Sequence, residues 1–147
     1  MGWIEEIIEK AYWPVFMIKY FYFSIIETFT TMNIEEIRDY CLSKPAVTES
    51  LPFNDTALVF KVAGKMFALL DLSEKARGLT LKCDPELAIE LREQHSEVTP
   101  AWHFNKQHWN GVDLKGSIGD HQLQEWIDHS YAIVVDSLPK SKREALR

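Results

Sequence analysis

The chain has 147 residues, of which 46% are hydrophobic, and a formal net charge of −6. A chain of this length and apolar content forms one domain with an adequate core, so it needs no disulfide or structural metal for stability. The acidic balance argues against bulk attraction to polyphosphates, although the stretch 56–82 has five basic and two acidic residues, a local charge of +3.

Residues 1–31 differ in composition from the rest of the chain. The stretch 11–26 is dense in aromatic residues, but Pro14 and Lys19 interrupt it, so it is a poor transmembrane helix. Glutamates stand where a signal peptide would have a basic region, and no small-residue cleavage site follows. The segment therefore matches neither a membrane span nor a secretory signal.

A helix start follows Met32 directly. Asn33 is a good N-cap, and Glu36 three residues later completes a capping box. We therefore expect Met32 to be the natural start, residues 1–31 to be a non-native, aromatic-rich N-terminal extension, and residues 32–147 to form the domain. The alternative is a native hydrophobic arm that packs on the domain or on a membrane.

The first half of the domain predicts a helix followed by strands. Apolar residues at helical spacing predict a helix over 34–43, which the Lys44-Pro45 pair ends, and a polar loop follows over 46–55. Two β runs, 56–62 and 66–72, flank Gly64, which supplies the positive φ of a tight hairpin turn. In the first of these strands alternate residues face opposite sides of the sheet.

The second half predicts more helix than strand. Asp84 and Pro85 are typical of an N-cap and a first helical position. The other expected elements are a strand over 78–82, an extended stretch over 98–101, a helical turn over 103–108, a strand over 109–114, and a long helix from its cap Asp120 to 137. Short turns between consecutive strands indicate antiparallel pairing, so the fold class is α+β, a small antiparallel sheet packed against helices.

The two cysteines, Cys41 and Cys83, belong to no CxxC or Cys/His metal spacing. We expect both to be reduced, partly buried thiols, as is usual in the cytoplasm. The segment 100–112 is the most distinctive part of the chain, with two histidines, two tryptophans, two asparagines and a lysine. His103 and His108 are five residues apart, which does not place two metal ligands on one helical face. The simpler, structural interpretation is a Trp/Tyr pair that anchors a loop on the sheet, with His and Asn satisfying backbone groups.

The sequence gives no reason to propose an enzyme or a cofactor. Asp128 and His129 are adjacent but point to different faces of their helix, so they are not an acid/base dyad. The chain has no nucleophile-elbow, dinucleotide-binding or P-loop motif. The basic run 140–143 is typical of a solvated helix end.

Several ordered blocks resemble the MmcQ/YjbR-like family of bacterial domains. The resemblance covers residues 32–147 and none of the extension. The blocks are IEEIRDYCLSKPAVTES, VFKVAGKMFALLDL, LTLKCDPELAIELREQH, VTPAWHFNKQHWNGVDLKGSI and LQEWIDHSYAIVVDSLP, and the run HFNKQHW, 103–109, is the most specific. The resemblance implies a CyaY-like α+β fold described as a double-wing DNA-binding motif, with no known enzymatic activity or cofactor.

If the resemblance holds, basic residues should reach DNA phosphates and polar or aromatic ones should touch bases or sugars. The phosphate-binding candidates are Lys61, Lys65, Lys82, Lys106 and Lys115, and the base- or sugar-binding candidates are His103, Asn105 and Trp109. Residues 32–147 remain acidic overall, with 14 basic and 18 acidic residues.

We therefore expect a non-enzymatic, cytoplasmic, DNA-binding or regulatory domain that contacts double-stranded DNA through a basic sheet face. Residues 32–147 are not expected to contact a membrane. The alternative is a protein- or small-molecule-binding module that uses the segment Trp102–Trp109.

Overall fold

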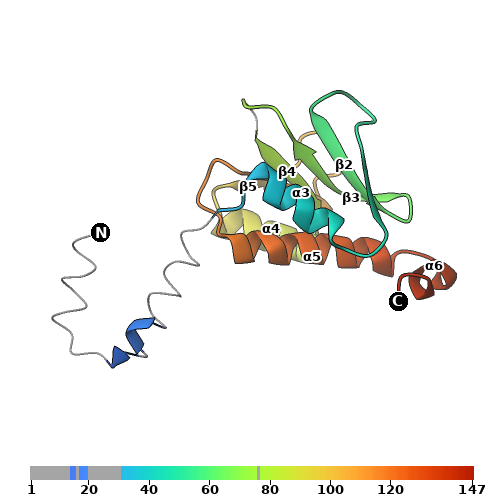
Figure 1. Cartoon of the computed structure of the whole chain (residues 1–147). Coiled ribbons are helices and arrows are strands. Elements are labelled where there is room, and N and C mark those ends of the chain that lie inside the picture. Colours follow the sequence, from blue (N-terminus) through green and yellow to red (C-terminus); the bar gives the residue numbers. More distant parts are fainter. Residues whose placement is uncertain (1–13, 16, 20–30, 76) are drawn as a thin grey trace. The chain divides into compact units, whose positions relative to one another are not determined.

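A computed structural model (Figure 1) describes residues 14–15, 17–19, 31–75 and 77–147 of the chain. It separates into two compact units, Met1–Thr30 and Thr31–Arg147. Most of the first unit lies outside the described residues, and so do the expectations for residues 1–31. No helix in the described part of the chain is both long and apolar enough to cross a membrane.

The second unit contains a six-stranded sheet with the order β1-β2-β3-β4-β6-β5. Every neighbouring pair of strands is antiparallel, which confirms the predicted α+β class with a small antiparallel sheet. The strands are β1 (Val47–Ser50), β2 (Ala57–Val62), β3 (Lys65–Asp71), β4 (Gly78–Lys82), β5 (Val98–Pro100) and β6 (Trp109–Asp113).

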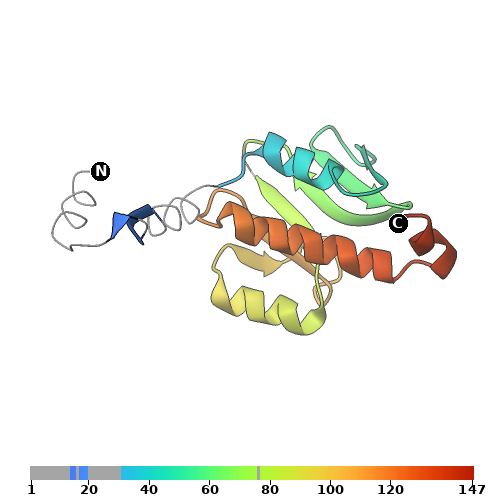
Figure 2. The same ribbon diagram turned by 60° about the horizontal axis from the view of Figure 1, so that its bottom comes forward.

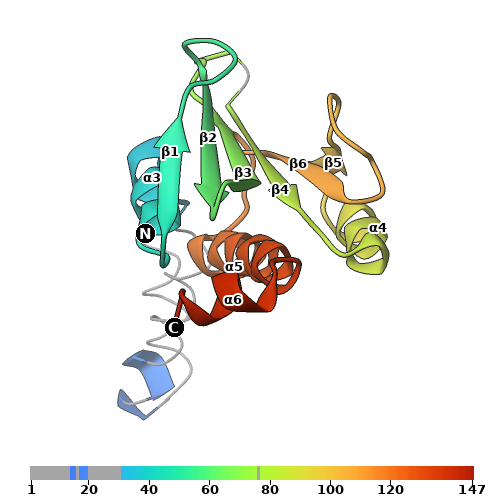
Figure 3. The same cartoon turned by 90° about the vertical axis from the view of Figure 1, so that its right-hand side faces the viewer.

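Helices cover one face of this sheet. They are α3 (Ile34–Leu42), α4 (Pro85–Gln94) and α5 (Asp120–Asp136), and the short α6 (Lys140–Glu144) follows α5. Helix α5 packs against β2, β3 and β4, while α3 packs against β1 and α4 against β5. Figures 2 and 3 show α3 and α4 on either side of α5. Within residues 31–75 and 77–147, no helix lies against the opposite face of the sheet.

Capping residues and turn residues in the sequence correctly predicted where several of these elements begin or end. The Asn33 side chain accepts a hydrogen bond from the Glu36 N–H, and the Glu36 side chain accepts one from the Asn33 N–H, so the capping box is confirmed. Asp84 caps α4, with Pro85 at its first position. The β2–β3 turn contains Gly64 at φ +82°, as a tight hairpin requires.

Three local predictions were wrong. The expected loop over 46–55 contains β1, a short edge strand that pairs with β2 through its main chain, which no apolar run could signal. Asp120 does not cap α5, because Gly119 has the extended backbone of an N-cap and Asp120 is already helical. The segment 103–108 forms successive turns instead of a helical turn.

The core lies between the sheet and the helices. Leu58, Phe60 and Val62 of β2 point into it, which confirms the predicted alternation along that strand. Ile127 of α5 is fully buried against them. The other side of the sheet carries both apolar residues, such as Val59 and Leu69, and polar ones, such as Thr80.

Candidate functional site

The helix-free face of the sheet is called here the open face. Strand register places one row of residues across it, because directly paired residues point to the same side. The row runs across all six strands: Ser50, Val59, Leu69, Thr80, Gly111 and Thr99. At its centre, Thr80 and Gly111 leave the backbone thinly covered.

Two adjoining grooves lie on the open face, with volumes of about 570 Å³ and 610 Å³. Both are lined by Gly78, Thr80 and Trp102, so they meet over β4. Two large aromatic side chains stand at the grooves and are mainly in solvent: Trp102 is 82% exposed and Phe53 is 69% exposed. Exposed aromatic side chains that line a groove are typical of a binding surface.

Helix α4 holds the loop that carries Trp102. The Arg92 guanidinium donates to Asn110 Oδ1 at 2.7 Å and to the backbone carbonyl of Lys106. The Phe104 and Trp109 rings pack with centroids 5.0 Å apart. The 101–108 loop is therefore held against β6 by the Arg92 hydrogen bonds and by the Phe104–Trp109 contact, and Trp102 projects from this anchored loop.

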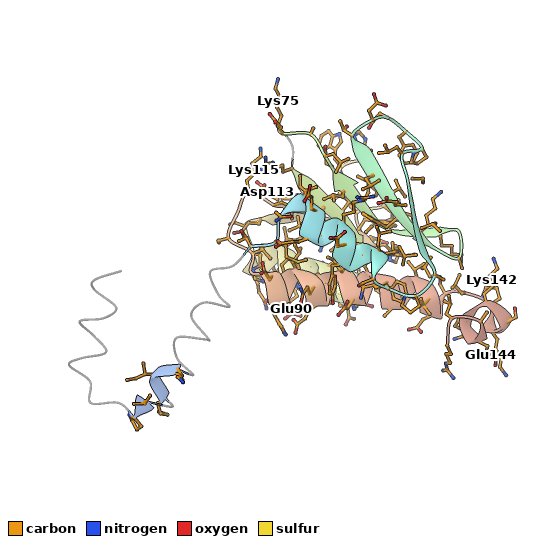
Figure 4. The ribbon with its side chains drawn as sticks, viewed as in Figure 1. Lys75, Glu90, Asp113, Lys115, Lys142 and Glu144 are labelled. Carbon is orange, nitrogen blue, oxygen red and sulfur yellow. The ribbon has the colours of Figure 1, made fainter. Side chains whose placement is uncertain are left out.

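Basic side chains gather at the first groove. Arg77, Lys106 and Lys115 are among its described lining residues. The Lys106 ammonium lies 5.6 Å from the centroid of the Trp102 ring, and Lys115 Nζ donates to the carbonyl of Lys75 at 2.5 Å. Figure 4 shows Lys75 and Lys115 at one end of the domain and Lys142 of α6 at the other.

The carboxylates in the grooves belong to turns. Asp113, in the first groove, accepts a hydrogen bond from the backbone N–H of Lys115 at 2.9 Å. Asp71, in the second, accepts one from the N–H of Ser73 at 2.8 Å. Each carboxylate thus has a structural partner, while the ammonium of Lys106 lies above an exposed ring and faces solvent.

The structure brings together only part of the predicted DNA-binding set. Lys106 and Lys115 line the first groove and His103 lines the second. By strand register Lys61 and Lys82 are on the open face, but neither lines these grooves. Lys65 lies elsewhere, with its Nζ 3.5 Å from the backbone carbonyl of Ser137, which follows α5.

Two other predicted residues have structural partners. Asn105 accepts a hydrogen bond from the Gln107 N–H at 2.9 Å, and Trp109 packs on Phe104. The Asn105 contact is of the predicted kind, a side chain that satisfies a backbone group, but the aromatic pair is Phe/Trp instead of the predicted Trp/Tyr. Sequence reasoning missed Arg77, Phe53 and Gly111, although a glycine inside a strand is a recognised sign of close approach by a ligand or another chain.

The groups considered for catalysis are separated. Asp128 accepts hydrogen bonds from the Tyr40 hydroxyl and from Lys44, whereas His129 Nε2 accepts from the Asp84 N–H at 3.2 Å. Within the described residues no group of three or more His, Cys, Asp or Glu side chains could hold a metal ion.

The cysteines are free, and both are buried, whereas the sequence predicted partly buried thiols. Burial is the main cause that raises the pKa of Cys41 to about 12 and that of Cys83 to about 11. Both thiols are therefore protonated at neutral pH and poor nucleophiles.

Comparison with known proteins gives consistent matches. The sequence model of the YjbR family matches residues 42–133. The chain is 41% identical to the uncharacterised protein YjbR of Escherichia coli K12 over 115 residues, which cover 78% of the chain and 98% of that protein. It is 32% identical to the uncharacterised protein YbdF of Escherichia coli O157:H7, over 77% of the chain and 93% of that protein.

Solved structures agree with the fold. A Deinococcus radiodurans protein with a DUF419 domain superposes with a TM-score of 0.73 at 35% identity, over 81% of this chain and 89% of that one. A Pseudomonas syringae protein superposes with a TM-score of 0.61 at 29% identity, over 69% of this chain and 98% of that one.

Proposed function

The chain belongs to the YjbR family, and from this premise we propose that it is a non-enzymatic DNA-binding domain that holds DNA against the open face of its sheet. One observation carries the proposal: Arg77, Lys106 and Lys115 converge on a groove beside the exposed ring of Trp102. Phosphate contacts supply most of the non-specific affinity for DNA, and aromatic rings add contacts to bases or sugars.

The net charge of −6 does not oppose this assignment, because the charges are unevenly placed. Affinity depends on the field at the contact surface, and charges farther away than about 8–10 Å are largely screened at physiological salt. The first groove has three basic side chains and one acidic side chain, Asp113, among its described lining residues. The local field at that groove is therefore positive.

The proposal includes the absence of catalysis and a cytoplasmic location. The separated partners of Asp128 and His129 support the first part, because an acid/base pair must share a reacting group. The two free, buried thiols support the second, since reducing compartments keep cysteines unpaired. The predicted double-wing arrangement remains a prediction.

The direct test is fluorescence anisotropy of the full chain with a labelled, mixed-sequence DNA duplex over a range of salt concentrations. We expect micromolar binding at low salt that weakens steeply as salt rises. In the double variant Lys106→Ala/Lys115→Ala, the slope of log affinity against log salt should fall by about 2, because each phosphate contact contributes about 0.9.

The matched control is Lys140→Ala/Lys142→Ala, which removes two exposed ammonium groups from α6 at the other end of the domain (Figure 4). It changes the net charge by the same amount, so its slope should stay close to that of the parent. Equal effects of the two double variants would remove the proposal, and so would the absence of binding at low salt to DNA in both its duplex and its single-stranded form.

The size of the grooves supports a second candidate function, the binding of a small molecule or a protein. Volumes of about 570 Å³ and 610 Å³ fall within the range of small-molecule sites. In that case the segment Trp102–Trp109 would bind a small molecule or a protein. A ligand-dependent change in tryptophan fluorescence, together with no DNA binding at low salt, would favour this alternative.

A further inference from the structure

Gly111 occupies the middle of β6, where glycine weakens a strand because it is flexible and has no side chain to pack. The protein does not require it there. Its φ is not in the left-handed region, and a Cβ at this position would be 3.7 Å from Thr99 Oγ1 and 3.8 Å from the Thr99 carbonyl, both ordinary contacts. A larger side chain at Gly111 would cover part of the floor of the first groove, which Gly111 lines.

Trp102 stands beside this floor. It lines both grooves and is 82% exposed. Arg92 holds the loop in place, so the loop does not need a large aromatic side chain at this exposed position for its own packing. One ring face of an exposed tryptophan can receive another flat ring, and the nearby Lys106 ammonium, 5.6 Å from the ring centroid, places a positive charge at the same point. The site thus combines a stacking surface, an open floor and cations.

We propose that the groove takes single-stranded nucleic acid, with an unpaired base stacked on Trp102 above Gly111 and the neighbouring phosphates beside Arg77, Lys106 and Lys115. The inference rests on the proposed function and defines the form of nucleic acid that the site prefers. Bases inside a duplex are stacked on each other and present only their edges in the grooves, so they cannot stack on an aromatic side chain without being extruded. Unpaired bases are free to do so.

The second groove extends the site along the strand of nucleic acid. It meets the first at Thr80 and Trp102 and contains Phe53, which is 69% exposed. A second aromatic side chain offers a platform for a further base. Because every base has an aromatic face, recognition of this type is tolerant of sequence.

The test compares one labelled strand of roughly 12 nucleotides, a length within known single-strand site sizes, with the same strand annealed to its complement. The full chain is used, and anisotropy and tryptophan fluorescence are both recorded. An RNA strand of the same sequence distinguishes the two sources of an unpaired base. We expect at least tenfold tighter binding of the single strand than of the duplex, together with quenching of tryptophan fluorescence.

Three variants locate the contact. Gly111→Val fills the floor with a side chain that strands favour, and Trp102→Ala removes the ring; each should weaken single-strand binding roughly tenfold. Trp102→Phe should restore most of the affinity but remove most of the quenching. The control is Ser50→Val, which adds the same side chain to the same register row on β1, outside both grooves.

The outcomes separate the two proposals. Duplex binding that equals or exceeds single-strand binding, or single-strand binding unchanged in Trp102→Ala, overturns this inference and leaves the proposed function in place. Binding of neither form overturns both. Circular dichroism establishes that Gly111→Val is folded; if it is not, Trp102→Ala decides the question, because that side chain is exposed on a loop.

Discussion

Gly116 shows how one missing side chain positions the turn that carries Lys115. A Cβ at Gly116 would lie 2.2 Å from Glu97 Cγ, which is far inside contact distance. Glu97 Oε1 accepts hydrogen bonds from the Ser117 N–H at 3.2 Å and from the Ser117 hydroxyl at 3.1 Å. Glycine therefore lets the Glu97 side chain cross the turn and hold it against the end of β6.

We predict that Gly116→Ala lowers the free energy of unfolding by about 1–3 kcal/mol, the usual cost of overpacking. In a Glu97→Ala background the clash is absent, so the same substitution should cost less than about 0.5 kcal/mol, as surface changes do. Chemical denaturation of the four proteins gives this double-mutant cycle. Equal costs in both backgrounds would show that the clash does not determine the effect.

At the scale of elements, a polar cluster joins α3 to α5. The Tyr40 hydroxyl donates to Asp128 at 2.9 Å, and Lys44, which is 14% exposed, forms a salt bridge with the same carboxylate. The Lys44 ammonium also lies 4.7 Å and 5.5 Å from the ring centroids of Tyr40 and Tyr131. The cluster fixes the C-terminal end of α3 against the long helix.

Ionisation of Tyr40 at high pH should remove the stability that this cluster contributes. Burial, with the hydrogen bond to Asp128, raises the pKa of Tyr40 from 10.0 to about 12. As pH rises, the unfolded chain loses the phenol proton first, so this contribution to stability is complete below pH 10 and lost by about pH 12. We predict that the free energy of unfolding of the parent falls across this window, and that Tyr40→Phe falls less steeply. Parallel curves would contradict the assignment to Tyr40.

Arg92 connects α4 to β6 and to the loop that carries Trp102. We predict that Arg92→Met lowers the free energy of unfolding by about 2 kcal/mol, because charged hydrogen bonds to Asn110 and to the Lys106 carbonyl are lost. Hydrogen exchange at the backbone amide of His108 should accelerate. The control, Arg38→Met, breaks the exposed ion pair with Glu49 and should cost less than about 1 kcal/mol. Equal costs would mean that Arg92 does not fasten the loop.

The elements that sequence predicted well are those defined by neighbouring residues. Helix caps at Asn33 and Asp84 and the Gly64 turn depend on chemistry within a few positions. Strand β1 was missed because its pairing with β2 is its main support, and that pairing is not visible in four polar-rich residues. The prediction that Asp120 caps α5 was wrong because aspartate, a residue type that caps helices well, stands one position after the actual N-cap, Gly119.

At the scale of the whole molecule, the grooves could not be predicted because they depend on which loops meet over the sheet. Phe53 and Trp102 are 49 residues apart, and both line the second groove. The family resemblance gave the right fold and candidate lysines, of which Lys106 and Lys115 share a groove and Lys65 lies elsewhere. Charge placement, not net charge, distinguishes these positions.

Binding on the open face is tested most directly by mapping the amide chemical shifts of the full, isotopically labelled chain as single-stranded DNA is added. We predict the largest shifts at Thr80, Gly111 and the indole N–H of Trp102. Shifts concentrated in α6, with Gly111 and Trp102 unchanged, would contradict it and place any binding on the basic helix at the other end of the domain.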